Sequence, residues 1–302
     1  MSLPASSSIA PAPHEPPLVV LDKVMDLCPF PATALRIIAL TSKTDVNASE
    51  VVEALACDPA MTVEVLRVAN SAGYARSRKI DDLQQAVMTV GLAGLRNLAT
   101  AIGMMGAFRS KEEASLELHA TSVLSGAIAA NLMVRIDKSL KSSAFLCGLL
   151  CEVGALTCLA VDGPRYMKLW NCALLSGPHW SLSGIERRED MEKERYGATS
   201  REIGACLMRR YLLPEDLALA VESGGTLVPP GPLPRVTIFA RVATPLVVDG
   251  FRNEIDTSAE LREIGVRSGI TEVDPDDLLE ICRVAAEAAE RSLRKTRSKA
   301  TS

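Results

Sequence analysis

The sequence predicts an all-α protein in which an N-terminal helical bundle packs on a second, larger helical bundle. Apolar residues recur with the helical period of about 3.6 residues through most of the chain, and no segment shows the strict alternation of a β-strand. Apolar residues make up 48% and charged residues 23% of the 302 residues, as expected for a globular protein with a substantial core. The polar link Ser110-Lys111-Glu112-Glu113 predicts the division between the bundles.

The N-terminal bundle is predicted over residues 18–109, after a Pro/Ser/Ala-rich tail at 1–17 that we expect to be disordered. The first helix begins at Pro31 with the apolar pattern Leu35, Ile38, Ala39. Further helices are expected after the cap candidate Asn47, after Asp58-Pro59, over 83–90, and from Gly91 to about Phe108.

The second bundle is predicted over residues 110–292, followed by a basic tail at 293–302. We interpret the charge run 186–195 as the solvated face of a helix, and Ala144–Val161, which contains Glu152, as a buried central helix rather than a membrane span. A loop is expected at 229–234. The predicted helices lie at about 113–135, 142–162, from near Ser183, and at 200–212, 214–223, 235–249, 258–267 and 275–294.

Composition argues against several classes of function. The net charge of −4 and the scarcity of aromatic residues (Trp 2, Tyr 4, Phe 5) disfavour nucleic-acid binding. Three histidines limit metal and acid–base chemistry, and the eight cysteines form no Cys-x-x-Cys pair. We interpret the cysteines as core thiols in a reducing cytoplasm, with a thiolate metal or redox site as the alternative. The first residues carry no secretory signal, so we expect a cytoplasmic protein without membrane insertion.

Several short segments form a recognisable set: Pro29-Phe30-Pro31-Ala32, Asp58-Pro59-Ala60-Met61-Thr62, Leu66-Arg67-Val68-Ala69-Asn70-Ser71, Val90-Gly91-Leu92, Gly148-Leu149-Leu150-Cys151-Glu152-Val153-Gly154 and Glu202-Ile203-Gly204-Ala205. Together they resemble the HDOD domain (HD-related output domain), over about residues 20–290. The resemblance implies a bacterial protein and a helical relative of the HD phosphohydrolases that has lost catalysis.

The resemblance also points to a vestigial HD site. HD phosphohydrolases bind cations through histidines and aspartates, and this chain departs from that pattern at most of the corresponding positions. The residues placed at this site by the resemblance are His119, Cys151, Glu152, Ser200, Gly224, Gly225 and Arg241. His119 stands near the first ligand position, as the one remnant of the ligand set, and we interpret it as a helix-face residue rather than a functional base. We therefore expect no metal, no cofactor and no catalytic residue.

Glu152 lies in so apolar a stretch that it needs an internal partner, because an unpaired buried carboxylate is costly. The aligned position of Arg241 makes it the candidate partner. The resemblance implies a non-enzymatic signalling scaffold, a pseudoenzyme, that contacts signalling proteins of a two-component or cyclic-di-GMP pathway. The alternative is a sensor that binds a small molecule, such as a nucleotide, in the vestigial cavity.

Overall fold

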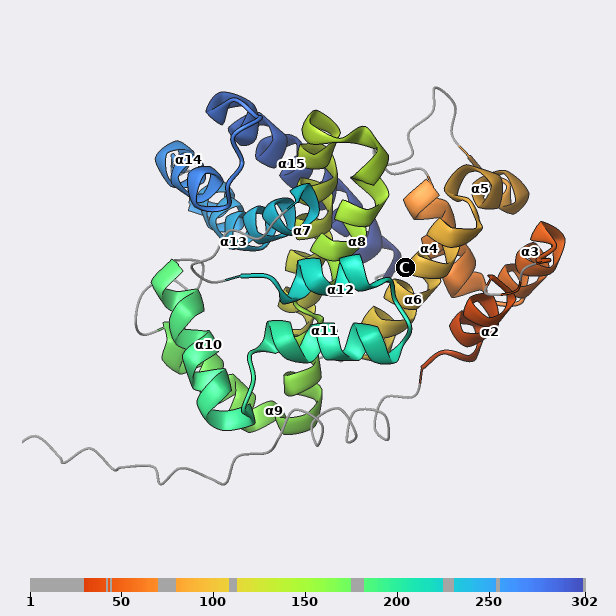
Figure 1. Cartoon of the computed structure of the whole chain (residues 1–302), viewed down its shortest axis with the longest axis horizontal. Helices are drawn as coiled ribbons and strands as arrows, with labels where there is room; N and C mark the ends of the chain where they lie inside the picture. Colours follow the sequence, from red (N-terminus) through yellow and green to blue (C-terminus); the bar gives the residue numbers. More distant parts are fainter. Residues whose placement is uncertain are drawn as a thin grey trace, which may run out of the picture.

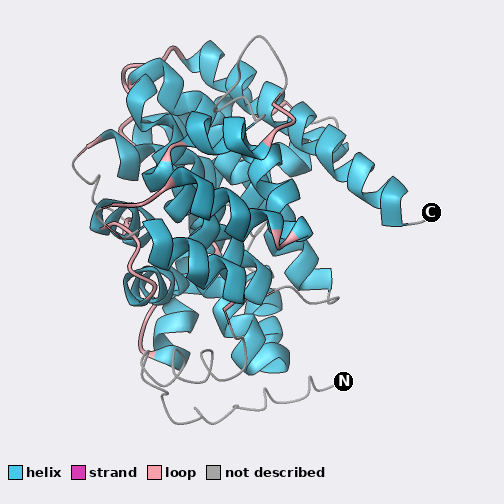
Figure 2. Cartoon of the chain, turned by 90° about the vertical axis from the view of Figure 1, so that its right-hand side faces the viewer, coloured by secondary structure: helices cyan, strands magenta, loops and turns pink. Residues whose placement is uncertain are grey.

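A computed structural model describes residues 30–41, 43, 45–69, 80–108, 113–174, 182–224, 231–253 and 256–300. Within these ranges every regular element is a helix and no strand occurs, as Figure 2 shows. The predicted all-α class is confirmed. The segment expected to be a disordered tail, residues 1–17, lies outside the described residues.

Five helices form the N-terminal part: α2 (Ala32–Thr41), α3 (Ala48–Ala56), α4 (Pro59–Ala69), α5 (Leu83–Val90) and α6 (Leu92–Ala107). The predicted caps are present. The Asn47 side chain accepts a hydrogen bond from the amide of Ser49, and the carboxylate of Asp58 accepts one from the amide of Met61 at 3.0 Å. Gly91, with a φ of +75°, separates α5 from α6, whose axes differ in direction by 104°.

The buried face of α2 differs from the predicted pattern. Ala34 and Ile37 are fully buried, whereas Leu35 is 49% exposed. The cause lies in α6, where a side chain at Gly103 would overlap Phe30 and approach Ala34. Because the two helices meet at small residues, α2 turns Ala34 toward α6 and leaves Leu35 outside.

The C-terminal part contains the remaining described helices. They are α7 (Glu113–Ile136), the short 3₁₀ helix η1 (Lys138–Leu140), α8 (Lys141–Leu150), α9 (Val153–Leu174), α10 (Leu182–Tyr196), α11 (Ser200–Arg210), α12 (Glu215–Glu222), α13 (Pro232–Asn253), α14 (Ser258–Arg267) and α15 (Pro275–Ala300).

Several boundaries differ from those predicted, among them the end of α9, which reaches Leu174 instead of about residue 162. The single helix expected at 142–162 is interrupted at Cys151 and Glu152, between α8 and α9. The helix α13 begins inside the expected loop, at Pro232, because proline is tolerated in the first helical turn. The helix α15 continues to Ala300, through most of the segment expected as a basic tail, where its cations suit the C-terminal end of a helix dipole.

The helices α2 to α6 pack on one another, and α6 joins this group to the second group through α8 (Figure 1). Close packing of α7 on α8 depends on Gly148, where a Cβ atom would lie 2.5 Å from the carbonyl oxygen of Ser125. This approach brings α7 beside the break between α8 and α9. The buried apolar side chains of both groups form one continuous core.

One apolar segment, Lys138–Trp170, is long and apolar enough to cross a membrane, and 83% of its most apolar window is buried inside the protein. The bent pair α5 and α6 passes the same test only when it is counted as one broken segment. The interpretation of Ala144–Val161 as a central core segment agrees with this burial.

Candidate functional site

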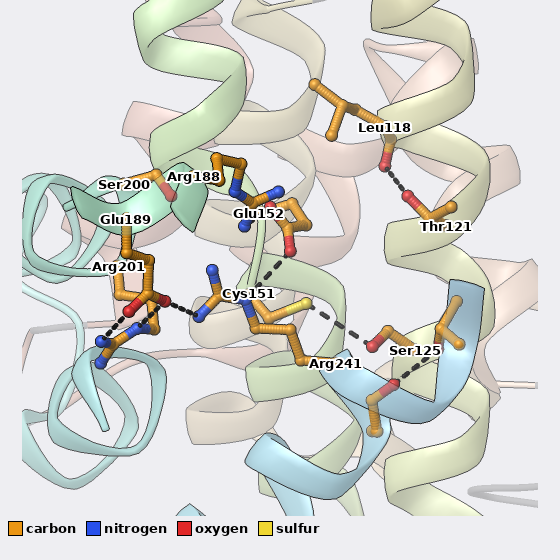
Figure 3. A network of polar contacts seen from close by, with 12 residues as sticks. Leu118, Thr121, Ser125, Cys151, Glu152, Arg188, Glu189, Ser200, Arg201 and Arg241 are labelled. Atoms are coloured by element: carbon orange, nitrogen blue, oxygen red, sulfur yellow. Dashed lines mark hydrogen bonds and ion pairs between the residues drawn. The ribbon is translucent and has the colours of Figure 1, made fainter. Parts of the chain in front are cut away.

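The interior of the C-terminal part contains a cluster of three carboxylates and three guanidinium groups. Figure 3 shows the part of it that consists of Glu152, Arg188, Glu189, Arg201 and Arg241. We call it the buried charge cluster. Its six members come from the α8–α9 break (Glu152), from α10 (Arg188, Glu189 and Glu192), from α11 (Arg201) and from α13 (Arg241).

Glu152 contacts two arginines. One carboxylate oxygen lies 3.0 Å from Nε of Arg241, and the other lies 3.4 Å from Nη2 of Arg188. The predicted ion pair between Glu152 and Arg241 is confirmed. Glu152 is only 9% exposed, so both contacts are shielded from water. Sequence reasoning missed the second partner, Arg188.

Glu189 and Glu192 complete the cluster. Glu189 accepts two hydrogen bonds of 2.6 Å from Arg201 and lies 3.3 Å from Nη1 of Arg241. Glu192 is fully buried, and it accepts hydrogen bonds from the hydroxyl of Tyr166 at 2.9 Å and from the amide of Ser200 at 2.7 Å. With both signs present in equal number, the cluster can remain buried without a net charge.

The interpretation of residues 186–195 as a solvated helix face is wrong for the side of α10 that faces the protein. Arg188 and Glu192, four residues apart, are 7% and 0% exposed. The guanidinium carbon of Arg188 also lies 5.0 Å from the ring centre of Trp170. On this side α10 packs through charged side chains, because the side chains that it meets on α9, α11 and α13 are polar as well.

The arginines keep the carboxylates ionised. Burial raises the pKa of Glu152, but the charges of Arg188 and Arg241 outweigh that effect and leave the pKa below its ordinary value. Burial likewise acts against ionisation of Glu189, and the hydrogen bonds from Arg201 with the charge of Arg241 lower its pKa to about 2. Neither group has the raised pKa of a general acid working near neutral pH.

A small cavity adjoins the cluster. Its volume is about 30 Å³, enough for about two water molecules. Its charged and thiol lining comes from Glu117, Cys151, Glu152, Arg188 and Arg241. Burial raises the pKa of the Cys151 thiol to about 12, with a further contribution from the charge of Glu152, and the thiol donates to the hydroxyl of Ser125 at 3.5 Å. It is therefore a protonated core thiol.

The other predicted site residues lie in different surroundings. Both ring nitrogens of His119 face backbone carbonyl oxygens, Nδ1 that of Ser115 at 2.6 Å and Nε2 that of Met105 at 2.9 Å. His119 thus fastens α7 to α6 and does not join the cluster. Ser200 joins it through its backbone amide.

Gly224 packs directly on the guanidinium of Arg201, where a Cβ atom would lie 2.6 Å from two of its atoms. The small residue therefore makes room for an arginine of the buried charge cluster. Gly225, the last residue placed at the site by the sequence, lies outside the described residues.

These side chains do not fit the divalent cation that the wider HD fold implies. Glu152 is already bound by two guanidinium groups, whose positive charge opposes a cation. Cys151 holds its proton, and the nitrogens of His119 are directed at carbonyl oxygens. Across the described ranges, no three His, Cys, Asp or Glu side chains are grouped to hold a metal ion. We derive no chemical step through a metal.

The architecture is that of the HD-like helical proteins. The chain belongs to the HDOD domain family, whose model matches residues 27–224. An uncharacterized protein of Treponema pallidum (strain Nichols) is 26% identical over 200 residues, which are 66% of this chain and 37% of that protein. The chain thus spans little more than a third of the length of that relative.

Solved structures resemble the whole fold. A candidate phosphohydrolase from Shewanella amazonensis SB2B has a TM-score of 0.64 and 25% identity, covering 89% of this chain and 93% of its own. An HDOD domain protein of unknown function from Geobacter sulfurreducens has a TM-score of 0.57 and 17% identity, covering 91% and 96%. A candidate signal transduction protein from Marinobacter aquaeolei VT8 has a TM-score of 0.56 and 22% identity, covering 89% and 60%.

Proposed function

We propose that this protein is a non-enzymatic regulator in bacterial signal transduction that acts through contacts with other proteins. Membership of the HDOD family supports a regulatory role, as does the likeness in fold to a candidate signal transduction protein. The observation that carries the proposal is the contact of Glu152 with Arg188 and Arg241. In this arrangement Glu152 stabilises the fold, because the positive charges of the two arginines balance its negative charge.

The same contact argues against phosphoester hydrolysis. Metal-assisted hydrolysis needs ligands that converge on a cation and activate a water molecule. Here the Glu152 carboxylate in the cavity lining is neutralised by two guanidinium groups, and the neighbouring Cys151 thiol is protonated. Hydrolysis of a generic phosphodiester with Mn²⁺, Mg²⁺ or Fe²⁺ tests this argument. We expect no turnover above that of Glu152→Gln, and metal-dependent turnover that this substitution abolishes would overturn the proposal.

The alternative, a nucleotide sensor, is less well supported by the cavity. Pockets for such ligands span about 300–1,000 Å³, whereas the cavity beside Arg241 measures about 30 Å³. A nucleotide could enter only if α10, which supplies Ile185 and Arg188 to the lining, moved away. A nucleotide panel in a thermal-shift assay separates the two functions, since a saturable stabilisation would favour the sensor.

The partners that we propose are signalling proteins of a two-component or cyclic-di-GMP pathway in the bacterial cytoplasm. Exposed apolar side chains are common contacts in such interfaces, and Met88 and Leu212 are 76% and 77% exposed. Proximity labelling in bacterial cells should capture the same signalling proteins with the wild type and with Glu53→Gln, an exposed control on α3. Loss of these proteins in Met88→Glu or Leu212→Glu would locate the contact, and capture of no signalling protein by the wild type would contradict the proposal.

A further inference from the structure

The carboxylate of Glu189, on α10, is bound by arginines from two other helices. It accepts hydrogen bonds of 2.6 Å from Nε and from Nη2 of Arg201, and it lies 3.3 Å from Nη1 of Arg241. Figure 3 shows it between these two guanidinium groups. A guanidinium group binds phosphate through the same pair of parallel N–H donors. Glu189 therefore occupies a position in which an oxyanion ligand would find its donors.

Both guanidinium groups are positioned by contacts that do not involve α10. Arg201 donates through Nη1 to the carbonyl oxygen of Glu222, at the end of α12, and it packs against Gly224. Arg241 donates through Nε to Glu152 at 3.0 Å, at the break between α8 and α9. These contacts keep both arginines in place when α10 moves. A binding site that is already arranged loses less free energy to ordering when its ligand arrives.

Two buried polar atoms of this region are not used by Glu189. Nη2 of Arg241 and Oγ of Ser200, which precedes Arg201 in α11, have no hydrogen-bond partner within the described part of the chain. Arg241 and Ser200 are only 7% and 2% exposed, so these atoms need an explanation. A carboxylate offers two oxygens in one plane, whereas a phosphoryl group offers three that point in different directions. A phosphoryl group therefore suits this set of donors better than the carboxylate that fills it.

We propose that Arg201, Arg241 and Ser200 form a binding site for a phosphate-type oxyanion, and that Glu189 occupies this site from within the same chain. The charges agree with such a ligand. Without α10, the cluster retains Arg201, Arg241 and Glu152, a net charge of +1 that a singly charged phosphate group balances. Ser200 is also the first residue of α11, where the end of the helix dipole favours an anion.

The helix α10 is suited to give way to this ligand. On its inner side Arg188, Glu189 and Glu192 provide polar contacts, and the last two accept hydrogen bonds from α11. When charged groups move out of the interior they regain water, which offsets much of the lost attraction. Tyr196, 2% exposed, keeps the C-terminal end of α10 packed, so the movement concerns the part before it. The apparent affinity for the oxyanion is reduced by the fraction of molecules in which Glu189 fills the site.

Removing the internal carboxylate should strengthen phosphate binding. Isothermal titration calorimetry of the full chain with inorganic phosphate, near neutral pH and at constant ionic strength, measures this effect. Glu189→Ala empties the site of its carboxylate and leaves the cluster with one positive charge in excess. We expect its dissociation constant for phosphate to be at least about tenfold lower than that of the wild type, which corresponds to about 1.4 kcal/mol. Adding Arg201→Met to Glu189→Ala should remove the gain.

A second variant and two controls keep the test independent of folding. Glu189→Gln should also bind phosphate more tightly than the wild type, by a smaller factor, because its neutral amide still fills the space. If circular dichroism shows that Glu189→Ala has lost its helical content, Glu189→Gln decides the test. Glu186→Ala, at an exposed position on α10, should bind phosphate as the wild type does. Acetate, which supplies only a carboxylate, should gain less than phosphate from either substitution of Glu189.

Several outcomes would overturn the proposal. They are the absence of any gain in the folded Glu189 variants, an equal gain in Glu186→Ala, a gain that survives Arg201→Met, and acetate binding as tight as that of phosphate. The calorimeter records binding and neither hydrolysis nor the capture of a partner. A failure here is therefore distinguishable from a failure of the proposed function.

Discussion

Removing both charges of the pair Glu152–Arg241 should destabilise the protein by less than the sum of the two single removals. The two guanidinium groups lie 3.0 Å and 3.4 Å from the Glu152 carboxylate. At an effective dielectric constant of about 20, each attraction is about 5 kcal/mol before the desolvation of the charges is subtracted. The measured cost of leaving one member of a buried pair without its partner is about 3–5 kcal/mol. We expect that cost for Glu152→Met and for Arg241→Met, and a smaller one for Glu152→Gln, whose amide oxygen still accepts a hydrogen bond.

The double variant Glu152→Met/Arg241→Met should behave differently. Without these two residues, Arg188 still lies 3.5 Å from Glu192, and Arg201 keeps its two hydrogen bonds to Glu189. The remaining charges are balanced, so the double variant should be less destabilised than the sum of the single variants by about 2–3 kcal/mol.

Urea unfolding followed by circular dichroism measures these free energies. The control is Glu280→Gln, which alters an ion pair with Arg283 whose side chains are 53% and 51% exposed. It should cost less than about 0.5 kcal/mol. Additive single and double variants would refute the coupling, and a silent Glu152→Met would refute the burial of a paired carboxylate.

Three further outcomes follow from the described contacts. The pKa values of Glu152 and Glu189 are lowered in the folded state, to about 2 for Glu189, so the stability that these carboxylates contribute is complete above about pH 4.5 and is lost as the pH falls through their folded-state pKa values. Acid unfolding midpoints should show this loss, and Glu189→Gln should reduce it. Gly154→Ala should be severely destabilising in thermal unfolding, because a Cβ atom there would overlap the carbonyl oxygen of Ser200. In the native protein, iodoacetamide should label the exposed Cys57 and leave Cys151 unmodified until unfolding, as mass spectrometry of the labelled peptides can show.

The helical framework was predictable because its signals are local. Asn47 and Asp58 form the caps that their residue types indicate, and both caps involve amides two or three residues away. The free-energy cost of burying an unpaired carboxylate, together with the aligned position of Arg241, was enough to predict the partner of Glu152. That inference needed only one strong requirement, that a carboxylate in an apolar stretch be paired.

The rest of the site depends on partners distant in the sequence. Arg188 is 36 residues from Glu152, and Arg241 is 89 residues from it. In the sequence, a run of charged residues such as 186–195 looks the same whether the folded helix presents it to water or to other charged side chains. The buried face of α2 was equally hidden, because it is set by Gly103 on another helix.

The equal number of opposite charges in the buried charge cluster has a consequence for how this sequence can evolve. Any single substitution that removes or reverses the charge at one of these positions leaves an unbalanced charge in the interior; the positions are Glu152, Arg188, Glu189, Glu192, Arg201 and Arg241. Substitutions at these positions should therefore persist only when a second, compensating one accompanies them. Among descendants of this chain, these six positions should change in pairs of opposite sign. A return to metal binding would require the loss of at least two arginines before any ligand could be gained, so reversion by single steps is blocked.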